Sequence, residues 1–135
     1  MTILKTWFTA YVLHASFYLF TGEIAGAILV AMFSFPASLL GIPVLYLFWT
    51  ITSDRATDKI WITVSSCLVG AVTAVAASLA TIAVIAKSLS GETLASNSLF
   101  IVLPVLAAIF SIVFWRSDIY TYAQRHVSPK TETEL

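Results

Sequence analysis

The sequence predicts an all-α fold: an integral membrane bundle of four transmembrane helices, with both ends of the chain on the cytoplasmic side. Hydrophobic residues make up 59% of the 135 residues and charged residues only 10%, whereas soluble domains carry roughly 25% charged residues. The apolar residues gather in four long segments, and crossing a bilayer takes about 20 such residues. Basic residues concentrate in the connections that this arrangement places on one side of the membrane.

The first predicted span covers residues 3–21, and Gly22 and Glu23 form the tight connection that ends it. Lys5 and the apolar run after it have the outline of a signal peptide, but the run contains tryptophan, histidine and tyrosine, which are unusual there. No small-x-small cleavage site precedes Glu23, so we expect this segment to be a helix of the mature protein. We interpret Glu23 as a capping or solvated carboxylate; the alternative is an acidic site at the mouth of a pathway.

The second predicted span, residues 24–51, is uncharged and contains two prolines. At 1.5 Å per residue it would be roughly 42 Å long, which exceeds the ~30 Å of the hydrocarbon core. Pro36 and Pro43 each remove a backbone donor, and Gly41 between them weakens the helix further. We therefore expect a kinked or broken helix around residues 34–43. Two interpretations stay open: a packing kink, or a helix break that forms a substrate site near the bilayer midplane.

The third predicted span, residues 60–86, follows a polar connection over residues 52–59 and has a middle rich in small residues. Three of these recur at four-residue spacing and therefore share one helix face: Gly70, Ala74 and Ser78. Small residues at that spacing allow two helix backbones to approach closely. This packing stripe predicts a helix–helix contact, either inside the bundle or between subunits.

The fourth predicted span covers residues 99–115 and carries Pro104 in its first turns, where proline is tolerated. Apolar and aromatic residues keep helical spacing after the charges return, so we expect a short extension along the membrane surface to residue 126. The membrane domain then comprises residues 1–126, and residues 127–135 form a polar tail.

The distribution of lysine and arginine predicts the orientation, because basic residues are enriched in cytoplasmic connections. With the N-terminus inside, six basic residues are cytoplasmic: Lys5, Arg55, Lys59, Arg116, Arg125 and Lys130. Only Lys87 falls on the other side. Four tryptophans lie near the cytoplasmic face, where indole rings favour the headgroup layer: Trp7, Trp49, Trp61 and Trp115. We expect a multi-pass protein of a bacterial cell inner membrane.

His14 is the main candidate for a functional residue, because it lies near the middle of the first span. Tyr11 and Tyr18 lie three residues before it and four after it, on the same helix face. This candidate intramembrane polar site could pass a proton or bind a ligand between helices. The alternative is a neutral histidine hydrogen-bonded to a neighbouring helix. The other histidine, His126, follows the last span and is poorly placed to share a haem, so we expect no cofactor.

Several function classes do not fit the composition. Basic and acidic residues are equal in number, seven each, which leaves no basic excess for binding nucleic acid. Cys67 is the one cysteine and lies in an apolar run, so we expect neither a disulfide nor a multi-cysteine metal site. No catalytic combination such as Ser-His-Asp can be placed on one membrane face, and no phosphate-binding glycine loop appears. We therefore expect no catalytic residues, no bound metal and no enzyme activity.

In hydropathy, the four spans resemble two kinds of small bacterial four-helix protein. Immunity proteins against pore-forming toxins sit in the inner membrane and recognise toxin helices. Small multidrug-resistance transporters dimerise and carry a lone acidic residue in their first helix, where this chain has His14. We interpret the chain as a non-enzymatic accessory, assembly or immunity-type subunit that contacts a membrane protein partner within the lipid bilayer. The alternative is a small transporter or channel that works as a homo-oligomer and uses His14 and the broken second helix.

Overall fold

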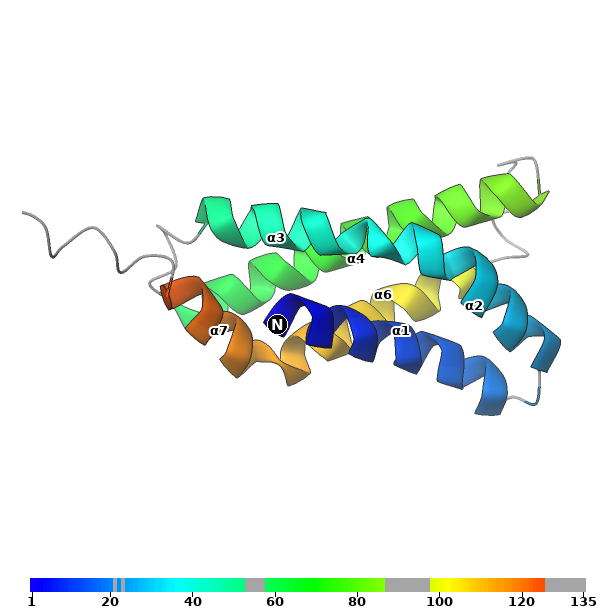
Figure 1. Cartoon of the computed structure of the whole chain (residues 1–135), viewed down its shortest axis with the longest axis horizontal. Coiled ribbons are helices and arrows are strands. Elements are labelled where there is room, and N and C mark those ends of the chain that lie inside the picture. Colours follow the sequence, from blue (N-terminus) through cyan, green and yellow to red (C-terminus); the bar gives the residue numbers. More distant parts are fainter. Residues whose placement is uncertain (21, 23, 53–57, 87–97, 126–135) are drawn as a thin grey trace, which may run out of the picture.

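A computed structural model of the chain describes residues 1–20, 22, 24–52, 58–86 and 98–125. These residues form six α-helices: α1 (Thr2–Phe20), α2 (Ile24–Leu39), α3 (Gly41–Thr52), α4 (Lys59–Ala86), α6 (Ser98–Phe114) and α7 (Arg116–Arg125). The helices lie side by side along the long axis of the molecule, and α7 turns across one end (Figure 1). No strand occurs in the described ranges, so the predicted all-α fold is confirmed for them.

The second predicted span is divided into α2 and α3 by a turn at Leu40, within the interval where a kink or break was predicted. The Leu40 amide donates to the carbonyl of Ala37 at 3.3 Å, a tighter turn than that of an α-helix. Pro36 lies inside α2, whereas Pro43 is the third residue of α3. Proline is tolerated in a first helical turn because the amides there have no intrahelical acceptor.

Among the described residues, two helical segments are long and apolar enough to cross a membrane: Phe35–Thr52, with 18 residues, and Lys59–Val84, with 26 residues. A third would be α6 and α7 taken together as one broken span, although their axes differ by 66°. The segment corresponding to α1 is not among them. Membrane-spanning helices are thus supported by length and composition, and the count of four stays a prediction.

The main cluster of buried apolar side chains in the described part of the chain lies near the end of the molecule where α7 packs. They come from α1, α3, α4, α6 and α7: Ile3, Leu45, Trp49, Ile62, Ile112, Ile119 and Ala123. In Figure 1 the start of α1, the end of α3 and the start of α4 all lie at this end. The first turn of α4 is fixed there by Asp58, whose Oδ1 accepts a hydrogen bond from the amide of Ile60 at 2.9 Å.

The interior is unusually polar and the surface unusually apolar. Six polar side chains among the described residues are buried: Thr6, His14, Ser66, Ser78, Thr81 and Ser111. Large apolar side chains are exposed on every helix except α7, including Phe8 at 59%, Leu68 at 67% and Phe110 at 58%. A soluble monomer does not expose apolar surface so widely, whereas a lipid environment favours it. This distribution fits a membrane protein.

Several sequence predictions concern residues outside the described ranges. These are the role of Glu23, the placement of Arg55 and Lys87, the position of His126 and the polar tail over residues 127–135. They stay predictions.

Candidate functional site

A cavity of about 110 Å³, partly open to the surface, lies between α1, α4, α6 and the junction of α2 and α3. Its walls include His14 and Tyr11 from α1, Gly41 from the start of α3, and a series of small residues from α4. The cavity therefore unites parts of all three groups of residues that the sequence singled out separately.

On the α1 side, the cavity is bordered by aromatic rings at helical spacing. Trp7 and Tyr11 stack with their ring centroids 5.8 Å apart and an interplanar angle of 13°. The edge of Phe35 from α2 packs against both rings, with centroid distances of 5.6 Å and 5.4 Å. The indole nitrogen of Trp7 donates to the carbonyl of Ser38 at 3.0 Å. These contacts fasten α1 to the last turn of α2, just before the helix break.

His14 is 94% buried, with only 6% of its surface exposed, and its side chain borders the cavity. Its Nε2 atom has no hydrogen-bond partner among the described residues. Buried polar atoms are satisfied in the great majority of cases, so an exception calls for an explanation. The alternative was a histidine hydrogen-bonded to a neighbouring helix. The described residues provide no such bond for Nε2.

The α4 wall is formed by the predicted packing stripe, because Gly70, Ala74 and Ser78 all border the cavity. At Gly70 the approach of α6 is so close that an added Cβ would lie 2.6 Å from Cδ1 of Ile112. The contact is therefore inside the molecule rather than between subunits at this position. The sequence left those two possibilities open.

Three of the predicted site residues do not border the cavity: Tyr18, Pro36 and Pro43. Tyr18 shares its helix face with His14, and their ring centroids are 5.8 Å apart. Its ring packs on Phe100 of α6 at 5.5 Å, and it is 7% exposed. The two prolines act on the backbone near the cavity and contribute no surface to it.

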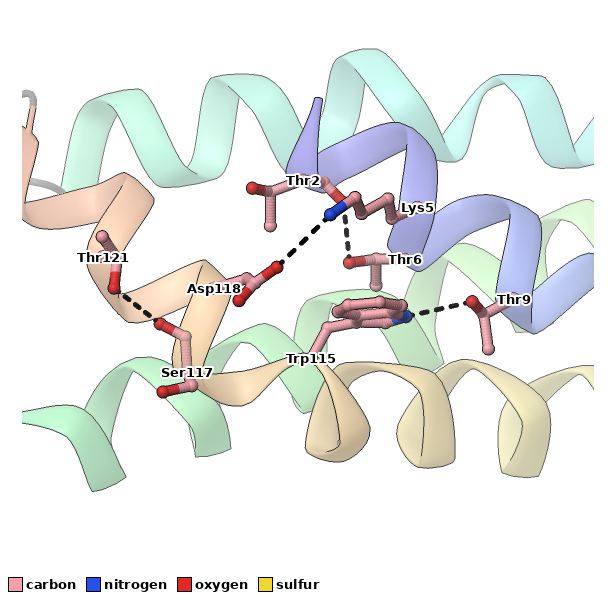
Figure 2. Close-up of polar contacts among 8 residues, drawn as sticks. All are labelled: Thr2, Lys5, Thr6, Thr9, Trp115, Ser117, Asp118 and Thr121. Atoms are coloured by element: carbon pink, nitrogen blue, oxygen red, sulfur yellow. Dashed lines mark hydrogen bonds and ion pairs between the residues drawn. The ribbon is translucent and has the colours of Figure 1, made fainter.

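A second polar cluster, missed by the sequence analysis, joins α1 to α6 and α7. The ammonium of Lys5 lies 3.8 Å from a carboxylate oxygen of Asp118 and 5.1 Å from the ring centroid of Trp115. The indole nitrogen of Trp115 donates to Oγ1 of Thr9 at 3.0 Å, and Figure 2 shows this bond beside the Lys5–Asp118 pair. The partners are far apart in sequence, so no local pattern could have indicated them.

Other hydroxyl groups in this region donate to backbone carbonyls. Thr6 donates to the carbonyl of Thr2 at 3.0 Å, and Thr121 donates to that of Ser117 at 2.9 Å. Ser111 of α6 donates across the helix interface to the carbonyl of Thr6. The hydroxyls of Thr6 and Ser111 are thereby satisfied without water, as a lipid environment requires.

The described residues contain no group of three or more histidine, cysteine or acidic side chains that could hold a metal ion. The cavity is lined mainly by apolar atoms and is bordered by the imidazole ring of His14. Comparison with protein families, curated proteins and solved structures finds no match to this chain, so its function has to be argued from this geometry.

Proposed function

We propose that the chain is a non-enzymatic, multi-pass inner-membrane protein that acts through helix–helix contacts as an accessory, assembly or immunity-type subunit. In this proposal it has four spans, and both ends are cytoplasmic. The apolar outer surface and the hydrogen-bonded polar interior support the membrane environment. The described basic residues support the orientation, because Lys5, Lys59, Arg116 and Arg125 belong to helix ends that lie at one end of the molecule (Figure 1).

The observation that carries the proposed role is a second row of small residues on α4. Ala76 and Ala80 are exposed, four residues apart on α4, and neither borders the cavity. They continue the exposed row of Val72 and Val84, which are 62% and 67% exposed. In a membrane, small side chains on an outer face let a second helix approach closely, and packing then drives association. At Gly70 the packing stripe is already covered by α6, whereas the row of Ala76 and Ala80 is open to a partner.

The test is affinity capture of the tagged protein from its native membrane in mild detergent, followed by mass spectrometry and size analysis. We expect a second membrane protein in stoichiometric amount with the wild-type chain. The double variant Ala76→Leu/Ala80→Leu should lose it, because leucine side chains hold the partner helix away. The matched variant Val102→Leu/Val113→Leu adds bulk to the exposed face of α6 and should retain it. Recovery of a pure homo-oligomer would contradict the accessory role.

The second candidate is the oligomeric transporter or channel, favoured by the cavity that lies between His14 and the helix break at Leu40. An interior site beside a helix break is the arrangement by which many transporters bind their substrates. A pure homo-oligomer in the capture experiment would direct attention here. Proteoliposomes should then show pH-dependent flux that is lost with His14→Ala, while the accessory role predicts no such flux.

A further inference from the structure

Two basic side chains lie together where α4 and α7 begin. The ammonium of Lys59 is 3.5 Å from Oγ of Ser117 and 5.9 Å from the ring centroid of Tyr120, so the start of α4 lies against the first turns of α7. Arg116 precedes Ser117 and shares a helix face with Tyr120, four residues later. Lys59 and Arg116 are both exposed. Together with the Ser117 hydroxyl they form what we term the basic cluster.

No described carboxylate is paired with the basic cluster. Asp118 is held by Lys5 at 3.8 Å, and one oxygen of Asp58 accepts a hydrogen bond from the first turn of α4 at 2.9 Å. No ion pair joins Lys59 or Arg116 to an acidic residue within the described part of the chain. The basic cluster is therefore open to an anion from outside the chain.

The basic cluster lies where the apolar surface of the molecule gives way to its charged end. Ile60, directly after Lys59, is exposed, and so are Val113 and Phe114, which lie just before Arg116. The axis of α7 differs from that of α6 by 66°, and α7 lies across the end of the molecule (Figure 1). In a bilayer, such a boundary coincides with the level at which headgroups meet acyl chains. A phospholipid offers the matching pair of groups, a phosphate and an apolar tail.

We propose that the basic cluster is a binding site for one anionic phospholipid. Lys59 and Arg116 bind the oxygens of its phosphodiester, and the Ser117 hydroxyl contributes a further hydrogen bond. The guanidinium can donate to two oxygens at once, whereas the ammonium acts as a point charge. The acyl chains lie along the exposed apolar residues of α4 and α6 next to the basic cluster. The proposal rests on the membrane placement in the proposed function, but neither on the accessory role nor on the orientation.

The charge at this end of the molecule favours an anionic lipid over a zwitterionic one. A zwitterionic headgroup carries an ammonium that needs an acidic partner, and the described acids here are outnumbered. Four basic side chains face two acidic ones at this end: Lys5, Lys59, Arg116 and Arg125 against Asp58 and Asp118. Basic residues next to a membrane are attracted to anionic lipids, by about 1 kcal/mol for each lysine or arginine, which corresponds to about fivefold in affinity.

Phosphatidylglycerol and phosphatidylcholine with identical acyl chains test the proposal, because only the first is anionic. The purified full chain is titrated with each lipid in a neutral detergent at 0.1 M salt, and native mass spectrometry counts the lipid molecules retained on each chain. We expect one phosphatidylglycerol to bind before any phosphatidylcholine. The double variant Lys59→Gln/Arg116→Gln should weaken its binding by roughly 25-fold, about fivefold for each charge removed. Binding of phosphatidylcholine should stay unchanged.

Arg125→Gln is the matched control, because it removes an exposed cation from the same helix at a distance from the basic cluster. Arg125 lies nine residues after Arg116, about 14 Å along the helix axis. Charges that far apart are largely screened at 0.1 M salt, so this variant should retain phosphatidylglycerol. Should the double variant not fold, Arg116→Gln alone takes its place, with an expected loss of about fivefold.

Three results would overturn the proposal. Equal weakening by Arg125→Gln would show a diffuse attraction to this end of the molecule, and equal binding of the two lipids would show no selection of the headgroup. Displacement of phosphatidylglycerol by inorganic phosphate would indicate a site for a soluble anion. Capture of a partner tests the row of Ala76 and Ala80, so a failure of lipid binding and a failure of the accessory role are separate outcomes.

Discussion

At the scale of single residues, the hydrogen bond between Trp49 and Ser66 closes the interface of α3 and α4. The indole nitrogen donates to Oγ of Ser66 at 2.9 Å, and the two residues are 1% and 0% exposed. The indole also lies 5.8 Å from the ring of Tyr122 in α7. Neither water nor lipid can replace the serine as acceptor, so the bond should matter more for stability than an exposed one.

Ser66→Ala is therefore expected to lower the free energy of unfolding by about 1–3 kcal/mol, because it leaves the Trp49 N–H buried without an acceptor. The measurement is equilibrium or thermal unfolding in mild detergent. Ser65→Ala serves as control, since the Ser65 hydroxyl is bonded to carbonyls of its own helix at 2.7 and 3.2 Å and should cost little. Trp49→Phe combined with Ser66→Ala should cost less than the sum of the single changes. Equal effects of Ser65→Ala and Ser66→Ala would refute the argument.

Trp49 also shows that the position of a tryptophan in the sequence does not reveal whether its side chain faces lipid or the protein interior. Its position near the cytoplasmic end of a span predicted a place in the headgroup layer, along with Trp7, Trp61 and Trp115. In the structure Trp61 is 44% exposed, but Trp49 is buried. Whether an indole faces lipid or the interior depends on the rotation of its helix, and that is set by contacts with other helices rather than by depth in the membrane.

At the scale of helices, local sequence patterns predicted well where each helix begins and ends, but not which helices contact one another. Three spans, predicted over residues 3–21, 60–86 and 99–115, correspond to α1, α4 and α6 within one residue at each end. Charges and glycines mark these ends, so they are visible in the sequence. The sequence could not show that His14, Gly41 and Gly70 border one cavity, because that follows from how α1, α3 and α4 rotate against one another.

The close approach of α4 and α6 gives a prediction for Gly70. An added Cβ would lie 2.6 Å from Cδ1 of Ile112, so this end of the buried side chain must shift, and Ile112 borders the cavity. Gly70→Ala should therefore lower the free energy of unfolding by about 1 kcal/mol, the lower end of the range for overpacking. Ile112→Val, which removes the clashing methyl, should restore much of that loss when combined with it. Thermal unfolding of the single and double variants in detergent measures both effects.

Gly41→Ala is the matched control for that experiment. A Cβ at Gly41 would meet Cγ2 of Thr73 at 3.6 Å, which is ordinary van der Waals contact. We expect its unfolding temperature to stay close to that of the wild type. If Gly41→Ala and Gly70→Ala behave alike, or if Ile112→Val does not relieve the Gly70 variant, then close packing of α4 against α6 is not what requires glycine at position 70.

At the scale of the whole molecule, contacts of α1 with α7 and with Trp115, which lies between α6 and α7, bring the two ends of the described chain together. Lys5 pairs with Asp118, and Trp115 binds Thr9 (Figure 2). Both charges of the pair are 43% exposed, so the pair itself adds little to stability, typically 0–1 kcal/mol. Its value is positional: the first turn of α1 and the whole of α7 must lie at the same end of the molecule, whichever side of the membrane that is.

The predicted orientation can be tested by labelling single cysteines in a chain that carries Cys67→Ala. Ser98 and Thr121 are both exposed, at the start of α6 and in α7, so a cysteine at either position should be accessible from its own side. Because α7 lies at the end that carries the described basic residues, we expect it to face the cytoplasm. A membrane-impermeant maleimide added to intact cells should therefore label Ser98→Cys and spare Thr121→Cys, and permeabilisation should make the second site reactive.

Labelling of Thr121→Cys in intact cells, with Ser98→Cys protected, would reverse the topology and place the Lys5–Asp118 contact on the outside. Labelling of both sites before permeabilisation would contradict the crossing of α6 itself.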